Sequence, residues 1–170
     1  MNIRTLLATS LVPLFFLGSC GYHLGGLRCN ELKDMNTFCV NMFANHTVQP
    51  EVSSLMTTAL GDALQRDGSF RMASPAQSDF TIDGTVTSIS RQSLSADPDD
   101  TYISLEIGMT VHVSYKVTET KSGKVLMTGT TEAQGSYFND TGNIQSARSA
   151  ALSYAARQAA DNIVYQLTIP

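Results

Sequence analysis

Residues 103–117 read ISLEIGMTVHVSYKV, and this stretch decides the fold. Each odd-numbered position carries an apolar or aromatic side chain, and each even-numbered position carries a polar residue or glycine. A period of two is typical of a β-strand with one buried face and one face in water. A register shift of one residue would exchange the two faces, so the register is strongly specified. The sequence therefore predicts a long strand whose apolar side is covered by other elements.

Similar alternation predicts a strand on either side of this one in the chain. Residues 79–89 form the preceding strand, and residues 125–137 form the following strand after a hairpin turn at 121–124. Gly123 in that turn supplies the positive φ that a tight hairpin requires. One side of the preceding strand comprises Phe80, Ile82, Gly84 and Val86. The following strand has mostly small residues at its odd positions, which let a helix approach closely.

Two helices and one further strand complete the set of predicted elements. Residues 50–67 begin with Pro50, which suits a first helical turn, and are followed by Gly68, which suits a left-handed cap. The apolar stripe of this helix comprises Val52, Leu55, Met56, Ala59, Leu60, Ala63 and Leu64. A second helix over 145–167 has the stripe Ala147, Ala151, Tyr154, Ala155, Ala159, Ile163 and Leu167. Residues 36–42 alternate and predict the first strand of the chain.

These elements follow the order β-α-β-β-β-α. One apolar stripe on each helix and one apolar face on each strand predict an α+β two-layer sandwich, in which two helices pack on one face of a four-stranded mixed sheet. The first strand, the first helix and the second strand should form a right-handed parallel crossover. The other face of the sheet should be polar, with many Ser and Thr residues together with Glu106 and His112.

The start of the chain has the features of an export signal. An apolar run from Leu6 to Leu17 follows one basic residue and leads through small residues to Cys20. This pattern is typical of a secretory signal peptide, and the run is too short to span a bilayer. The tetrapeptide Leu-Gly-Ser-Cys that ends at Cys20 resembles a bacterial lipobox. The sequence therefore predicts a signal peptide at 1–19, acylation of Cys20 by chains such as palmitate, and a single domain over 20–170.

Two further cysteines, Cys29 and Cys39, lie in the predicted mature chain. Because exported proteins of this kind face an oxidising compartment, a disulfide between them is the preferred expectation. It would close a short loop and contribute roughly 3 kcal/mol in the chain-entropy model. Two free thiols remain an alternative. A metal site would need further ligands, and only His23 and His46 lie nearby in the sequence.

Composition and motifs argue against several classes of function. The net charge of −4 disfavours broad electrostatic binding to nucleic acid. None of the sequence signatures of nucleophile elbows, zinc proteases or P-loops occurs in the chain. The acidic residues Asp97, Asp99 and Asp100 lack the spacing of a calcium loop. We therefore expect no enzymatic activity, no catalytic residues, no metal and no cofactor.

Several stretches together resemble the LptE family of lipopolysaccharide-assembly lipoproteins. The start of the predicted mature chain is similar to the start of that family, and so are the turn before the first helix and the stretches after it. These stretches are Cys20-Gly21-Tyr22-His23-Leu24, Asn45-His46-Thr47, Pro50-Glu51, Asp67-Gly68-Ser69-Phe70-Arg71 and residues 79–86. The element order matches the family over essentially all of residues 20–168.

The resemblance implies a function in export of lipopolysaccharide to the cell surface. It implies a lipid-anchored protein on the periplasmic side of the outer membrane, which plugs an LptD-like β-barrel as a 1:1 heterodimer and helps it assemble. It also implies contact with lipopolysaccharide through basic residues in two loops. Here those loops contain Arg91 and no other Lys or Arg, so Arg91 is the one candidate for pairing with lipid A phosphates.

Two alternatives remain at this point. A lipoprotein activator of a periplasmic peptidoglycan synthase is also a small α/β domain on a lipid tether. Such activators usually have a long linker after the lipidated cysteine, whereas the first predicted strand here begins about sixteen residues after Cys20. A lipid-binding enzyme or carrier would need a closed apolar cavity, which the pattern does not predict.

Overall fold

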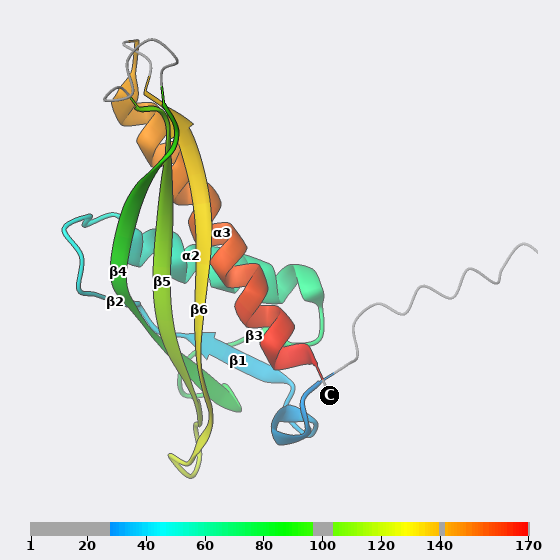
Figure 1. The fold of residues 1–170 in the computed structure, drawn as a ribbon. Helices are drawn as coiled ribbons and strands as arrows, with labels where there is room; N and C mark the ends of the chain where they lie inside the picture. The colour runs from blue at the N-terminus through cyan, green and yellow to red at the C-terminus, as the bar shows by residue number, and fades with distance from the viewer. Residues whose placement is uncertain (1–27, 97–103, 140–141, 170) are drawn as a thin grey trace, which may run out of the picture.

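The computed structural model describes residues 28–96, 104–139 and 142–169 (Figure 1). Its elements in chain order are the 3-10 helix η2 (Asn30–Leu32), β1 (Thr37–Val40), β2 (Ala44–Asn45), α2 (Val52–Asp67), β3 (Arg71–Met72), β4 (Phe80–Ala96), β5 (Ser104–Glu119), β6 (Val125–Phe138) and α3 (Ile144–Thr168). The predicted hairpin turn and helix cap are confirmed, because Gly123 and Gly68 adopt positive φ values of 69° and 76°.

The sheet is mixed and has six strands, in the order β3-β1-β4-β5-β6 with β2 also paired to β4. The long strands β4, β5 and β6 are antiparallel, whereas β1 and β2 pair with β4 in parallel. The α+β class and the parallel pairing of the first strand are therefore confirmed. The predicted number of four strands is wrong. The two additional strands, β2 and β3, have two residues each. Two residues are too few to show a periodic pattern, so only their pairing with a neighbouring strand identifies them.

Strand β4 extends beyond its predicted end at Ile89 and continues to Ala96. The additional residues pair with β5, as in Ser90↔Thr110 and Arg91↔Met109. Most of these residues are polar, and Leu94 and Ala96 are the exceptions, so no apolar alternation marks them as a strand. Irregularities in the β4–β5 register occur between Val86 and Ser88 and again after Ser93. The pairing partner β5 therefore decides where β4 ends.

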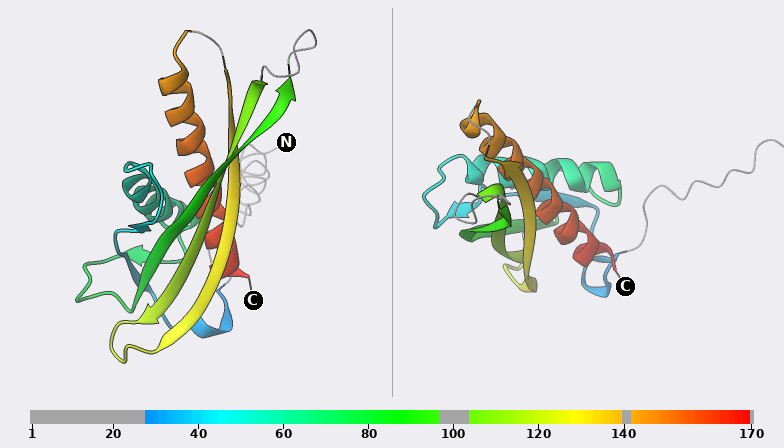
Figure 2. Two further views of the ribbon diagram at one scale, coloured as in Figure 1. Left: turned by 60° about the vertical axis from the view of Figure 1, so that its left-hand side comes forward. Right: turned by 45° about the horizontal axis from the view of Figure 1, so that its top comes forward.

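Both long helices lie on one side of the sheet, as Figure 2 shows. The core between the layers contains the predicted stripe of α2 and five odd-numbered residues of β5, namely Met109, Val111, Val113, Tyr115 and Val117. The stripe of α3 is confirmed except at Tyr154, which is 50 % exposed. A Cβ atom on Gly135 of β6 would lie 2.2 Å from the carbonyl oxygen of Ala151 in α3. This close approach confirms the role predicted for the small residues of β6.

Candidate functional site

The helix-free face of the sheet, which we call the open face, is polar over β4, β5 and β6. Cross-strand partners share a face, so the register identifies its residues. They form the rows Thr85–Ser114–Thr130, Ser88–His112–Glu132 and Ser90–Thr110–Gln134. All of these side chains are partly or fully exposed. The open face therefore offers a broad surface of hydroxyl and amide groups to a partner.

Two pairs of side chains lie close together across neighbouring strands on the open face. The Nδ1 atom of His112 lies 3.2 Å from Oε2 of Glu132, and its Nε2 atom lies 3.4 Å from Oγ of Ser90. Nζ of Lys116 lies 3.9 Å from Oδ2 of Asp83. Exposed pairs of this kind contribute little stability, typically below about 1 kcal/mol. They leave the described part of the open face with few uncompensated charges.

The open face is only shallowly hollowed. One groove of about 520 Å³ lies beside His112 and Glu132, and another of about 590 Å³ lies beside Asp83 and Lys116. Ser90, His112 and Glu132 lie in line on this face, but Ser90 does not line the first groove, and Ser90 and Glu132 are exposed on a flat sheet surface that does not enclose a substrate. Within the described ranges, no three His, Cys, Asp or Glu side chains gather as metal ligands. The arrangement suits recognition of a polar protein surface better than chemistry on a small molecule.

Apolar side chains interrupt the open face at the end of the sheet beside the start of α3. Leu94 is 43 % exposed and Phe138 is 65 % exposed. Phe138 lies opposite Glu106 in the register and therefore on the open face. A Cβ atom on Gly108 would lie 3.2 Å from Leu94 Cδ1, which places the Leu94 side chain on the same face. Sequence reasoning missed this patch because it placed the region around Leu94 in a loop.

Arg91 lies within β4 and not in a loop. Its cross-strand partner is the buried Met109, so Arg91 belongs to the helix side of the sheet and not to the open face. Its side chain is exposed. It borders a groove of about 500 Å³ that His46–Gln49 form with residues 87–91 of β4. The structure therefore separates Arg91 from Glu106 and His112, and brings it beside His46 instead.

Cys29 and Cys39 are both buried free thiols, so the structure contains no disulfide between them. Cys29 belongs to the core together with Phe38. Because successive residues of a strand alternate, Cys39 points to the opposite side of β1 from Phe38. Burial raises the pKa of both thiols, so both are protonated at neutral pH and weakly reactive. The expected disulfide is absent because Cys29 belongs to the core, whereas alternation along β1 directs Cys39 to the side opposite the core residue Phe38.

Other predicted features lie outside the described residues. These are the signal peptide at 1–19, Cys20, His23 and the acidic residues Asp97, Asp99 and Asp100. The structure consequently does not test lipidation. In the part of the chain that the structure describes, no helix is both long and apolar enough to cross a membrane.

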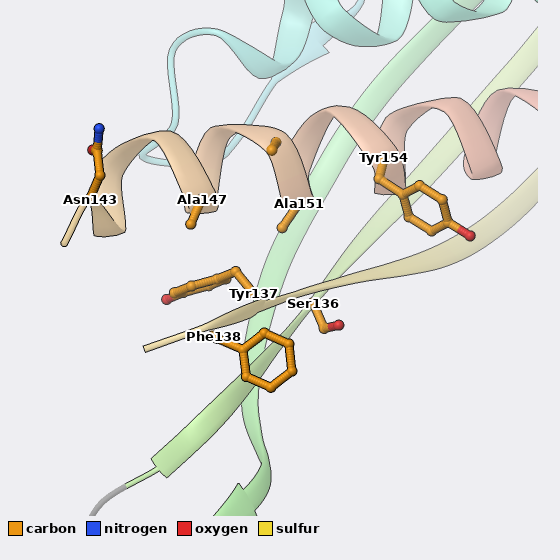
Figure 3. A pocket seen from close by; sticks show the side chains of 8 residues that line it. Ser136, Tyr137, Phe138, Asn143, Ala147, Ala151 and Tyr154 are labelled. Carbon is orange, nitrogen blue, oxygen red and sulfur yellow. The ribbon is translucent and has the colours of Figure 1, made fainter. Parts of the chain in front are cut away.

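A further groove, of about 550 Å³, lies between β6 and the first half of α3. Figure 3 shows Tyr137 between the strand and the helix, and Phe138 directed away from the helix. Tyr154 and Ala147 border the groove from the helix side. The sequence placed Tyr154 in the buried stripe because its spacing is helical. Helical spacing alone does not show that no other element covers the Tyr154 ring beside the outer edge of β6.

Comparisons with known proteins agree with this architecture. The sequence model of the family described as "LptE: Lipopolysaccharide-assembly" matches residues 35–167. No curated protein sequence matches the chain. A PelC dodecamer from Paraburkholderia phytofirmans is similar in structure, with a TM-score of 0.53 and 16 % identity over 79 % of this chain and 89 % of that chain.

Two further solved structures are similar. One is a putative lipoprotein from Caulobacter crescentus, with a TM-score of 0.52 and 15 % identity over 74 % of this chain and 87 % of that one. The other is the protein XCC0632 from Xanthomonas campestris, with a TM-score of 0.51 and 13 % identity over 76 % and 81 %. At these identities the likeness concerns the fold alone.

Proposed function

The chain belongs to the LptE family of lipopolysaccharide-assembly proteins, and from this premise we propose that it plugs an LptD-type outer-membrane β-barrel and helps that barrel assemble for lipopolysaccharide export. The family is not enzymatic, and the family match covers nearly all of the described fold. The proposal adds to family membership a partner, a 1:1 stoichiometry and a place in the outer membrane.

The open face is the observation that carries this proposal. Large outer-membrane barrels have a polar interior, because their inward-facing side chains alternate with lipid-facing ones. The rows of hydroxyl and amide side chains across β4, β5 and β6 match such a wall, and Lys116 lies beside Asp83 on the same face. A polar surface that is enclosed in a barrel does not need a heavily charged exterior for solubility.

The short distance between the predicted anchor and the folded domain supports a site of action at the surface of the membrane that carries the anchor. Nη2 of Arg28 donates to the carbonyl oxygen of Ser69 at 2.6 Å, and its guanidinium carbon lies 5.0 Å from the centre of the Phe70 ring. The chain is thus fixed at Arg28, eight positions after Cys20. Eight residues span at most about 29 Å. An acylated Cys20 would therefore hold the domain close to the membrane.

Affinity purification of the full-length protein from detergent-solubilised outer membranes tests the proposal. We expect a large β-barrel protein to be recovered in a 1:1 ratio. Depletion of the protein should lower assembled barrel and surface lipopolysaccharide before it changes peptidoglycan cross-linking. Normal barrel assembly with defective synthase activity in depleted cells would contradict the proposal and favour the alternative of a peptidoglycan synthase activator.

The lipid anchor has its own test. Cys20→Ala removes the thiol that receives the diacylglycerol, so we expect an unprocessed or soluble protein that carries no labelled palmitate. Ser19→Ala, which retains a small residue before the cysteine, is the matched control and should remain labelled. Labelling of Cys20→Ala at the wild-type level would refute the anchor.

A further inference from the structure

The outer edge of β6 is the feature that the proposed function leaves unexplained. In an antiparallel ladder, both backbone groups of a residue point to the same side, and alternate residues point to opposite sides. Asn162 Nδ2 of α3 donates to the carbonyl oxygen of Glu132 at 3.2 Å, and Gln166 Nε2 donates to that of Thr130 at 3.4 Å. Because Thr130 and Glu132 point outward, the continuous register makes Gln134, Ser136 and Phe138 point outward as well.

Other edges of this sheet are protected against pairing with a foreign strand. The α3 side chains cap β6 at Thr130 and Glu132. Strand β4 is free beyond its pairing with β2 at Val86, but its regular free run Ser88–Ser93 lies between two register irregularities and carries the charged side chain of Arg91. Strand β3 at the opposite edge has only two residues. Capping, bulges and short length are the usual means by which proteins block edge-to-edge pairing.

The segment Gln134–Phe138 has none of these devices. No irregularity occurs in its register with β5. Among the described residues, no group bonds to the outward N–H or C=O of Gln134 or Ser136. This stretch therefore presents backbone donors and acceptors in the spacing of a β-ladder, where another extended backbone would pair.

A groove accompanies this free edge. The 550 Å³ groove runs beside Ser136 and Phe138 under α3, and its helix wall consists of Ala147, Ala150, Ala151 and the Tyr154 ring. Figure 3 shows the groove from the edge side, with β4 and β5 behind β6. Its lining contains no charged side chain. The small alanines leave room for a backbone, and the phenol ring offers an apolar surface for a side chain.

We propose that the Gln134–Phe138 edge binds an extended, uncharged segment of the barrel partner as an added β-strand in the groove under α3. This inference rests on the proposed function, because it names the barrel protein as the donor of the segment. Backbone hydrogen bonds to Ser136 and Phe138 supply the affinity. The Ala147, Ala150 and Tyr154 wall selects small or aliphatic side chains.

A second copy of this chain does not fit the same edge. Adjacent strands lie about 4.8 Å apart, whereas packed helices need about 8–10 Å between their axes. Since α3 lies along the outer side of β6, two paired β6 edges would force two α3 helices into less space than they require. A single extended segment without a helical layer of its own avoids this conflict.

Hydrogen–deuterium exchange tests the inference on the full-length protein, alone and in the purified barrel complex, with fragmentation to single amides. We expect the amides of Ser136 and Phe138 to exchange at least tenfold more slowly in the complex. The amide of Thr128, which points outward on the same edge but lies outside the groove, should change less than threefold. Equal slowing at Thr128 indicates general occlusion and overturns the inference.

Two variants separate strand pairing from mere contact. Ser136→Pro removes the outward N–H without touching the bonds to β5, and Pro is tolerated on such edges. We expect about tenfold less barrel to be recovered with Ser136→Pro, and less than a twofold change with Thr128→Pro. Ala150→Arg fills the groove and should reduce recovery similarly, whereas Gln158→Arg, on α3 outside the groove, should not. Thermal unfolding of each isolated variant checks that it folds.

The outcomes distinguish the inference from the proposed function. Recovery of the barrel by the wild-type protein, with unprotected Ser136 and Phe138 amides and a harmless Ala150→Arg, overturns the strand-addition inference alone. Failure of the wild-type protein to recover any barrel overturns both proposals. Protected amides in a homodimer of the isolated protein, detected by light scattering, would assign the edge to a second copy and also overturn the inference.

Discussion

Asp79 connects the start of β1 to the start of β4 by hydrogen bonds to one carboxylate oxygen. Its Oδ2 atom accepts from the amides of Asn36 and Thr37 at 2.9 and 3.0 Å and from the Thr37 hydroxyl at 2.9 Å. The bond from the Asn36 amide, followed by the Thr37 hydroxyl, lowers the pKa of the Asp79 carboxyl below its ordinary value. A single ionised side chain thus helps to fix the parallel pairing of β1 and β4.

Asp79→Asn should destabilise the protein at neutral pH by about 1–2 kcal/mol, because it weakens charge-assisted hydrogen bonds. Since the folded-state pKa is lowered, the stabilisation is complete above the unfolded-state pKa and is lost as the pH falls through the folded-state pKa. The stability difference between wild type and variant should therefore shrink below about pH 4. Urea unfolding at pH 7, 5 and 3 measures it. A difference independent of pH would contradict the role of the charge.

Val111 and Thr110 are neighbours in β5 that point to opposite faces. Val111→Asp places a carboxylate in the core, where Val111 is fully buried, and should cost at least about 3 kcal/mol. Thr110→Asp lies on the open face and should cost less than about 1 kcal/mol. Thermal unfolding compares the two variants, and equal losses would refute the assignment of faces. A folded Thr110→Asp protein that fails to assemble with the barrel would identify the open face as the partner surface.

At the scale of elements, the contact between β6 and α3 depends on small residues. Gly135 permits the backbone of β6 to approach Ala151, and the alanines of α3 are buried along the same line. Tyr115 of β5 fills the space over Gly129 of β6, where a Cβ atom would lie 2.5 Å from the Tyr115 hydroxyl oxygen. That hydroxyl also donates to Oε1 of Gln166 at 2.5 Å. Strand, helix and neighbouring strand are thereby held in one relative position.

Gly135→Val should force α3 away from β6, because even its Cβ atom would lie 2.2 Å from a backbone oxygen that cannot rotate away. We expect a loss of about 2–3 kcal/mol in the free energy of unfolding, from overpacking. Gly142→Ala is the matched control, since a Cβ atom there would meet nothing within 4 Å. Urea unfolding of both variants provides the measurement. A wild-type stability of Gly135→Val would show that the helix does not approach as closely as described.

At the scale of the whole molecule, Arg91 is the one candidate that the sequence offers for pairing with lipopolysaccharide phosphates. Arg91 lies on the helix side of β4 beside His46, and the sequence around it contains Asp97, Asp99 and Asp100. Arg91 therefore belongs to the opposite side of the sheet from the polar open face, while the groove beside it reaches the edge of β4 at Ser88. This separation allows one side to contact the barrel while the other side contacts a ligand.

Binding of lipopolysaccharide by the isolated protein should accordingly be weak and should depend on ions. If Arg91 pairs with phosphate, 0.5 M salt should weaken binding through screening, and Arg91→Ala should reduce it about fivefold. If divalent cations bridge phosphate to the acidic residues, a chelator should abolish binding, and Arg91→Ala should have little effect. Titration of labelled lipopolysaccharide distinguishes the two. Tight binding that survives both salt and chelator would point to an apolar lipid site instead.

The sequence alone determined the elements whose own residues repeat with a clear period. Each of these features depends on the burial or backbone conformation of one local segment. They are the alternation of β5, the apolar stripe of α2 and the glycines at 68 and 123. Family membership likewise follows from the linear order of these segments, since the family match covers residues 35–167. The open polar face was predictable because the even-numbered positions of residues 103–117 are polar residues or glycine.

Only the tertiary structure decided the features that depend on a neighbouring element. Strands β2 and β3 and the extension of β4 exist because partners lie beside them, and the register of β4 with β5 places Arg91 on the helix side. Cys39 points away from the core residue Phe38 because successive residues of β1 alternate, whereas Cys29 lies in the core. The sequence does not show which side of β1 the core covers. The free edge of β6 and its groove arise beyond Glu132, where α3 side chains no longer bond to the strand. The physical reason is that strand pairing, register and helix packing depend on contacts between residues that are far apart in the sequence. Periodicity depends only on which side chains of one segment are buried and which are exposed to water.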